Sequence, residues 1–212
     1  MLKTSDGITI AGNHYKIPLE SPGISLFHMM PATKESYGDF AKKLNDAGLG
    51  ALAIDLRGHA NSEGGPNGFN EFSDEQHQES IKDVIAAVEF QKNEGHSPLF
   101  ICGASIGANL TLKYLAENDD VKKAILLSPG INYKGIESFP LAEKVSSDKE
   151  VYIVSAKDDI RELGPANEQG KKIFDALNCK KEIEVFDVGG HGTDIFKVHP
   201  EIMEKLIIWL KR

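Results

Sequence analysis

One serine stands between two glycines in the stretch 103–107 (GASIG). The apolar run 98–102 precedes it and predicts a buried strand, and residues 108–115 follow it with apolar side chains on one face of a helix. A serine on such a strand–turn–helix presents its hydroxyl to a substrate, and the small neighbours let strand and helix approach closely. Ser105 is therefore a candidate nucleophile. The alternative is a turn serine whose hydroxyl caps the following helix.

A serine hydroxyl is a weak nucleophile at neutral pH. It needs a histidine to accept its proton and a carboxylate to orient that histidine. Asp158 and Asp159 come soon after the apolar run 151–154, and His191 stands between glycines after the run 183–185. The chain order serine, aspartate, histidine is found in one large class of hydrolases. These residues predict a Ser–His–Asp triad in which either aspartate could be the acid.

Apolar, strand-like runs alternate with amphipathic helical segments along the chain. Strands are predicted at 24–29, 51–54, 98–102, 124–127, 151–154 and 183–185, and helices at 37–47, 73–92, 108–115, 166–177 and 200–210. This alternation predicts an α/β fold with a mostly parallel sheet flanked by helices on both faces, as a single domain over 1–212. The ligand site of such a sheet lies beyond the carboxyl ends of its strands, where all the triad candidates fall.

Together these motifs resemble the α/β-hydrolase superfamily over nearly the whole chain. The stretch 55–62 (DLRGHANS) resembles its D-x-R-G-x-G-x-S loop, and 190–192 (GHG) resembles its histidine turn. The stretch 155–160 (SAKDDI) resembles its G-x-x-D-x-[IV] acid loop. That alignment favours Asp158 over Asp159, so the triad implied by the resemblance is Ser105, Asp158 and His191.

The resemblance also implies where an oxyanion would bind. The segment 27–31 (FHMMP) occupies the place of the superfamily's H-G-x loop, with Met29 where glycine is usual. The family pattern implies that the backbone amides of Met30 and Ile106 are the two oxyanion donors. One such donor contributes roughly 2.7–4 kcal/mol of transition-state stabilisation. Both donors are backbone groups, so the side chains at these positions do not exclude the role.

The resemblance implies a serine hydrolase that cleaves short to medium acyl carboxylic esters through an acyl-enzyme intermediate, with no metal or organic cofactor. The interval 128–150 is too short for the large helical lid of many superfamily members, which predicts little or no cap domain and an open site. Apolar side chains are expected to line this site: Ile131, Tyr133, Ile136, Phe139 and Leu141 as a small wall, with Met29, Met30 and Ile106 beside the acyl group.

Other functions share these features. An acyl thioesterase or acyltransferase uses the same triad and differs only in substrate or acceptor. A peptidase is less favoured, because superfamily peptidases usually carry a further domain that selects the substrate. A non-catalytic binding protein on this fold would be expected to have lost a triad residue, whereas all three residue types are present.

Several polar residues near the motifs have structural explanations. His28 is expected to hydrogen-bond the loop in which it stands, and Asp55, Arg57 and His59 are expected to brace the loop beside the site. Metal ligation is not expected, because no histidine pair has the spacing of a helix-borne zinc site and there is no C-x-x-C.

The composition limits the partners. The net charge is −8 and the 24 lysines and arginines are scattered along the chain, which argues against nucleic acid or an anionic membrane as partner. Residues 1–7 lack the apolar core of a signal peptide, and no run approaches the roughly 18 apolar residues of a membrane span. Cys102 and Cys179 give no disulfide framework. We therefore expect a cytoplasmic protein whose partner is a small acyl ester.

Overall fold

The computed structural model describes residues 1–212, and its centre is a seven-stranded sheet. The strand order is β13–β10–β7–β6–β4–β5–β3. The strands are β3 (Gly12–Tyr15), β4 (Gly23–Phe27), β5 (Gly50–Ile54), β6 (Leu99–Ala104), β7 (Val121–Leu127), β10 (Glu150–Ala156) and β13 (Lys180–Phe186). Only β3 runs antiparallel to its neighbour. The prediction of a mostly parallel sheet is confirmed.

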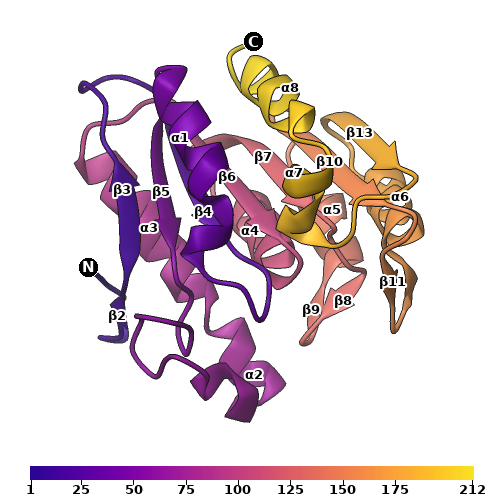
Figure 1. Ribbon diagram of the computed structural model, residues 1–212, viewed down its shortest axis with the longest axis horizontal. Coiled ribbons are helices and arrows are strands. Elements are labelled where there is room, and N and C mark those ends of the chain that lie inside the picture. Colours follow the sequence, from indigo (N-terminus) through magenta and orange to yellow (C-terminus); the bar gives the residue numbers. More distant parts are fainter.

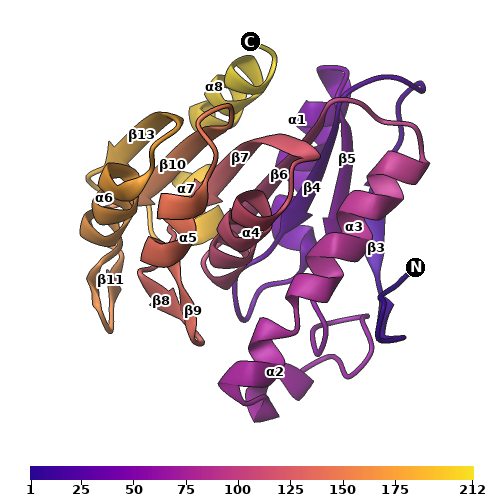
Figure 2. The same cartoon turned by 180° about the vertical axis from the view of Figure 1, so that it is seen from behind.

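Helices cover both faces of this sheet (Figures 1 and 2). On one face lie α1 (Gly38–Asp46), α7 (Ile195–Val198) and α8 (Glu201–Leu210); on the other lie α3 (Ile81–Asn93), α4 (Ile106–Glu117), α5 (Ser138–Lys144) and α6 (Ala166–Ala176). Each face has its own apolar core. Along β6, Leu99 and Ile101 belong to one core and Phe100 and Cys102 to the other, because successive side chains of a strand point to opposite faces. Both faces are buried, so the strands read as continuous apolar runs.

The helix predicted at 73–92 is wrong in one respect, since it is broken into two. The first piece, α2 (Asp74–Gln78), begins at the capping box of Ser73 and Gln76, and α3 begins at Ile81. Residues 74–79 contain no apolar side chain, so nothing anchors α2 to the sheet as the apolar face of α3 anchors that helix.

Short hairpins and α2 gather at the edge of the sheet where the parallel strands end (Figure 2). The hairpins are β8 (Asn132–Tyr133) with β9 (Ile136–Glu137), and β11 (Ile160–Arg161) with β12 (Gly164–Pro165); a further small pair, β1 (Leu2–Lys3) and β2 (Thr9–Ile10), lies near the N-terminus. The interval between β7 and β10 holds only the β8–β9 hairpin and α5, and no cap domain is evident. None of the helices combines the length and the apolar composition that crossing a membrane requires.

Candidate active site

Ser105 occupies the sharp turn between β6 and α4. Its backbone has φ 55° and ψ −120°, a conformation that a residue with a side chain adopts only under strain. Hydrogen bonds on both sides hold it there: its amide donates to the Leu127 carbonyl at 2.9 Å, and its own carbonyl accepts from the Ala108 amide at 2.8 Å. The Ser105 side chain makes no capping hydrogen bond to α4. The hydroxyl is thus not used as a helix cap, which was the alternative to a nucleophile.

The flanking glycines are required by close contact between backbones. A Cβ atom on Gly103 would lie 2.0 Å from the carbonyl oxygen of Gly107, and one on Gly107 would lie 2.3 Å from the carbonyl oxygen of Phe27. Real Cβ atoms essentially never come so close. The contact to Phe27 also places the start of α4 directly against the end of β4, where the predicted oxyanion segment begins.

Replacing Gly107 by alanine is expected to lower the free energy of unfolding by about 1–3 kcal/mol or more, because α4 must move away from β4. Gly38→Ala is the matched control. Gly38 has helical φ −50°, and a Cβ there meets nothing within 4 Å. That change is expected to stabilise the protein by about 0.4–1 kcal/mol. Urea denaturation of both variants measures the difference, and equal effects would contradict the close contact.

The histidine turn lies against the same elbow. His191 stands between Gly190 (φ +68°) and Gly192 (φ +56°), both in the left-handed region that favours glycine. The Gly192 amide donates to Ser128 Oγ at 2.9 Å, and a Cβ on Gly192 would lie 3.2 Å from the Cβ of Ala104. Gly192 follows the histidine and Ala104 precedes the serine. The fold therefore brings the turn that carries His191 against the elbow that carries Ser105, although the two are far apart in the chain.

The carboxylate that contacts His191 is Asp159. Asp159 Oδ2 lies 2.6 Å from His191 Nδ1, and Oδ1 accepts a 2.6 Å hydrogen bond from Arg161 Nε. Burial raises the pKa of Asp159, but its hydrogen bonds and attraction to His191 and Arg161 outweigh burial and hold the pKa below its usual value. Because a carboxylate only accepts hydrogen bonds, the proton between the two residues sits on Nδ1, which leaves Nε2 free to accept one.

The sequence-based choice of Asp158 as partner of His191 is wrong. Asp158 Oδ1 accepts hydrogen bonds from the amides of Gly189 and Gly190, at 3.0 and 3.1 Å. Asp158 thus fixes the loop that carries the histidine but does not contact its ring. The two neighbouring aspartates face different ways, since Asp159 is 4% exposed while Asp158 is at the surface.

The two predicted oxyanion donors lie at the same edge of the sheet. The Met30 amide makes no hydrogen bond within the protein. The Ile106 amide is the first of α4, where an amide has no partner within the helix. Met29, which replaces the usual glycine, packs under the histidine turn: its sulfur accepts a 3.9 Å hydrogen bond from Thr193 Oγ1 and would lie 2.6 Å from a Cβ on Gly192. The larger residue is accommodated because Gly192 has no side chain.

His28 is structural, as expected. It is fully buried, its Nε2 accepts from the Leu56 amide at 3.0 Å, and its Nδ1 donates to the Met29 carbonyl at 3.0 Å. Burial lowers the pKa of His28 to about 3, so the ring is neutral and can make both bonds.

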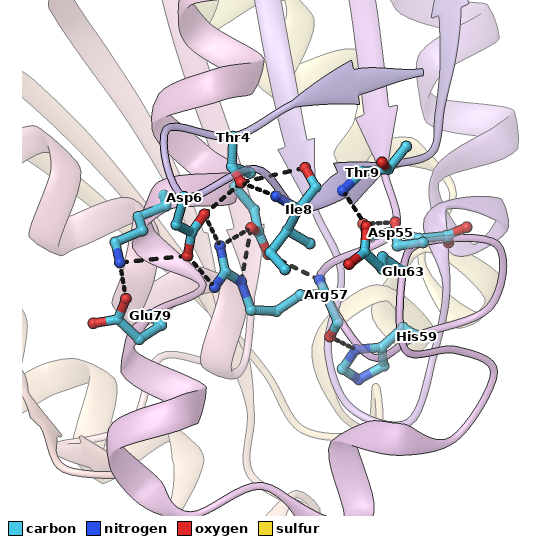
Figure 3. Close-up of polar contacts among 12 residues, drawn as sticks. Thr4, Asp6, Ile8, Thr9, Asp55, Arg57, His59, Glu63 and Glu79 are labelled. Atoms are coloured by element: carbon cyan, nitrogen blue, oxygen red, sulfur yellow. Dashed lines mark hydrogen bonds and ion pairs between the residues drawn. The ribbon is translucent and has the colours of Figure 1, made fainter.

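The loop after β5 is braced by ion pairs, as its sequence predicts (Figure 3). Arg57 donates from Nε to Asp83 Oδ1 at 2.9 Å and from Nη1 to Asp6 Oδ2 at 2.9 Å. The fully buried Asp55 is paired with Lys34 Nζ at 2.6 Å. His59 hydrogen-bonds the Arg57 carbonyl at 3.0 Å. None of these groups contacts the triad candidates.

A cavity of about 350 Å³ lies between α2 and the two hairpins, and two of its lining residues connect it to the candidate site: Met30 of the predicted oxyanion segment and Tyr133, whose ring lies near that of His191. Of the nine residues that line it, only Met30, Tyr133 and Leu163 are apolar. The predicted apolar wall is therefore wrong for most of its residues. Ile136 and Leu141 are buried in the core on the α4 face, with Ile131 packed against it, and Phe139 does not line the cavity.

Residues 23–149 match the family described as serine aminopeptidase, S33. The chain belongs to this α/β-hydrolase family. The matched S33 region contains the elbow serine and both predicted oxyanion segments, and it ends before Asp159 and His191.

Solved structures with the same fold include esterases. The Pyrococcus furiosus esterase Pf2001 superposes with a TM-score of 0.80 at 19% identity, over 100% of this chain and 88% of that one. An esterase from Exiguobacterium antarcticum gives 0.77 at 15% identity, over 100% and 98%. Est1E from Butyrivibrio proteoclasticus with bound ferulic acid gives 0.77 at 18% identity, over 98% and 96%. The α/β-hydrolase fold is thereby confirmed for this S33-family chain. A search of curated proteins finds no match.

The sequence did not point to Arg161, whose contact with Asp159 depends on the fold of the β11–β12 hairpin. Tyr133 lines the cavity as expected, and its ring centroid lies 6.5 Å from that of His191. The motif comparison carried no signal for Arg161, because it stands in a short hairpin outside the family's motifs.

Proposed function

We propose that this S33-family protein is a serine hydrolase that cleaves carboxylic esters, with Ser105 as nucleophile, His191 as general base and Asp159 as the residue that orients the histidine. The observation that carries the proposal is the 2.6 Å contact between the buried Asp159 and His191, on a turn that packs against the strained elbow of Ser105.

In the first step His191 Nε2 accepts the proton of the Ser105 hydroxyl as Oγ attacks the ester carbonyl. The backbone amides of Met30 and Ile106 stabilise the oxyanion that forms. The protonated His191 then gives its proton to the departing alcohol, and the acyl group stays on Ser105. Asp159, held as a carboxylate, stabilises the charged imidazole through Nδ1.

In the second step water takes the place of the alcohol. His191 removes a proton from water as it attacks the acyl-enzyme, and the same amides stabilise the second oxyanion. Collapse of this intermediate releases the acid and returns the proton to Ser105. Every proton in this cycle moves between Ser105, His191, water and substrate, so the residues present account for the whole reaction.

The absence of a cap domain supports an open site for short to medium acyl chains. The cavity of about 350 Å³ falls at the small end of the range for small-molecule sites. Its mostly polar lining supports a substrate with polar groups beyond the ester more than it supports a long alkyl chain. A thioester would enter the same chemistry, with a thiol leaving in place of an alcohol.

Two measurements test the proposal. A fluorophosphonate probe should label the protein once, on the peptide that contains Ser105, because the activated hydroxyl attacks phosphorus and fluoride leaves. A p-nitrophenyl ester series from acetate to palmitate should show turnover that declines towards the longer acyl chains. Amino-acyl p-nitroanilides test the peptidase activity that the family description suggests. No labelling and no ester turnover would refute the proposal.

A further inference from the structure

The cavity beside the elbow is rich in hydrogen-bond donors that have no partner in the protein. Arg161 uses only Nε, towards Asp159, and its two terminal nitrogens make no hydrogen bond. Asn132 uses only its side-chain oxygen, which accepts from the Gly135 amide at 2.9 Å, so its amide nitrogen is free. Lys134 has its nearest carboxylate, Asp74, at 3.7 Å, beyond hydrogen-bond range. All three residues line the cavity.

Tyr133 connects the cavity to the predicted nucleophile. Its hydroxyl is buried and has no partner of ordinary hydrogen-bond geometry, and its ring is T-shaped to that of His191, with the centroids 6.5 Å apart. Burial raises the pKa of Tyr133, and an interaction with the Ser105 hydroxyl lowers it in part. The phenol therefore lies beside Ser105 and is not a free donor for a ligand.

The guanidinium of Arg161 is oriented so that it can bind an anion. Its bond to Asp159 fixes one side of the planar guanidinium, and 38% of the side chain is exposed. The terminal nitrogens of a guanidinium form a fork that matches the two oxygens of a carboxylate. The chain as a whole carries a net charge of −8, so attraction of an anion has to come from such local donors.

The other charges of the cavity limit the anion to one of low charge. Asp74 lies near Lys134, and Glu162 also lines the cavity without an ion pair of its own. These carboxylates would repel a dianion such as a phosphate monoester more strongly than a single carboxylate. Gln169 is already engaged by the protein, because one of its two N–H groups donates to the Gly164 carbonyl at 2.7 Å and its oxygen accepts from the Ile131 amide at 3.0 Å.

We propose that this cavity binds a carboxylate of the substrate, with Arg161 as the residue that determines specificity, so that the preferred substrates are esters that also carry one free carboxylate. This inference rests on the proposed function for its turnover test, but the carboxylate site itself can be tested without catalysis. The carboxylate can stand on the acyl side or on the alcohol side of the ester, and the substrates below separate the two.

The binding test uses monomethyl glutarate, which carries one carboxylate and one ester, on the Ser105→Ala protein, measured by calorimetry. Monomethyl glutarate is expected to bind, and dimethyl glutarate is expected to bind at least about tenfold more weakly because it offers no charge to Arg161. Adding Arg161→Gln should remove the difference, and Arg161→Lys should retain part of it because the charge stays but the fork is lost. Lys197→Gln is the control, since it removes the same charge from α7 outside the cavity. Equal binding of the two compounds would overturn the inference.

The turnover test compares two matched pairs: monoethyl glutarate with diethyl glutarate, and 4-acetoxybutanoate with its methyl ester. We expect kcat/KM to favour the anionic member of at least one pair by about tenfold, and the favoured pair shows on which side of the ester the carboxylate lies. Arg161→Gln slows all four esters through Asp159, so the readout is the ratio within a pair, which should fall towards one. Lys197→Gln should leave that ratio as it is.

The two proposals fail in different ways. If neutral esters are hydrolysed at Ser105 and neither pair favours its anionic member, the carboxylate site is refuted and the serine hydrolase stands. If no ester is hydrolysed and the fluorophosphonate does not label Ser105, the hydrolase is refuted. Binding of monomethyl glutarate that depends on Arg161 would then still support a carboxylate site.

Discussion

Replacing Ser105 by alanine is expected to lower kcat on a p-nitrophenyl ester by about 10⁶, the scale found when such a nucleophile is removed from a serine hydrolase. Alanine cannot form the acyl-enzyme, so only the oxyanion donors and substrate binding remain to assist water. The measurement is steady-state hydrolysis of p-nitrophenyl acetate and butyrate by the variant and the wild type, after exclusion of contaminating esterase by active-site titration.

The control for this change is Ser128→Ala. Ser128 Oγ accepts the hydrogen bond of the Gly192 amide at 2.9 Å and so supports the histidine turn without being a nucleophile. We expect a much smaller loss in Ser128→Ala than in Ser105→Ala. The fold should survive Ser105→Ala, because the hydroxyl makes no capping bond that holds the turn. Equal ester turnover by wild type and Ser105→Ala would show that the activity belongs to another group.

Most of the fold could be predicted from the sequence because both faces of the sheet are buried. Each central strand is then a continuous apolar run, and each long helix has one apolar face. The sequence predicts one helix in place of α2 and α3, because the capping box at Ser73 lies close to the apolar pattern that begins at Ile81. The single domain, the cytoplasmic location and the small-ester partner stay predictions.

The candidate site could be predicted only as far as the backbone determines it. Ser105 and His191 stand on turns whose glycines are visible in the sequence. The prediction of an apolar wall was wrong because, in the sequence, an apolar residue that lines a site looks the same as one that packs in the core. Ile136 and Leu141 are buried in the core. Arg161 gave no signal, since its contact with Asp159 requires the hairpin to fold back at a particular angle.

Replacing Asp159 by asparagine is expected to lower kcat by about 10⁴, the loss known for the equivalent change in a serine protease triad. The amide group of asparagine can donate to His191 Nδ1 and so favours the tautomer with its proton on Nε2. That nitrogen could then not accept the proton of Ser105. The loss of activity should not reflect unfolding, because asparagine has the same shape as aspartate. Circular dichroism and urea denaturation of the variant check that the fold is retained.

The matched change at the neighbouring position decides between the two aspartates. In Asp158→Asn the side-chain oxygen remains and can still accept from the amides of Gly189 and Gly190, so kcat should change little. The two variants remove the same charge from adjacent residues, and only contact with His191 distinguishes them. Both aspartates stand in the turn after β10, where the residue types alone do not determine which side chain faces His191, and the motif alignment placed the acid one position too early. If Asp158→Asn proves the more damaging variant, the contact between Asp159 and His191 is not the one used in catalysis.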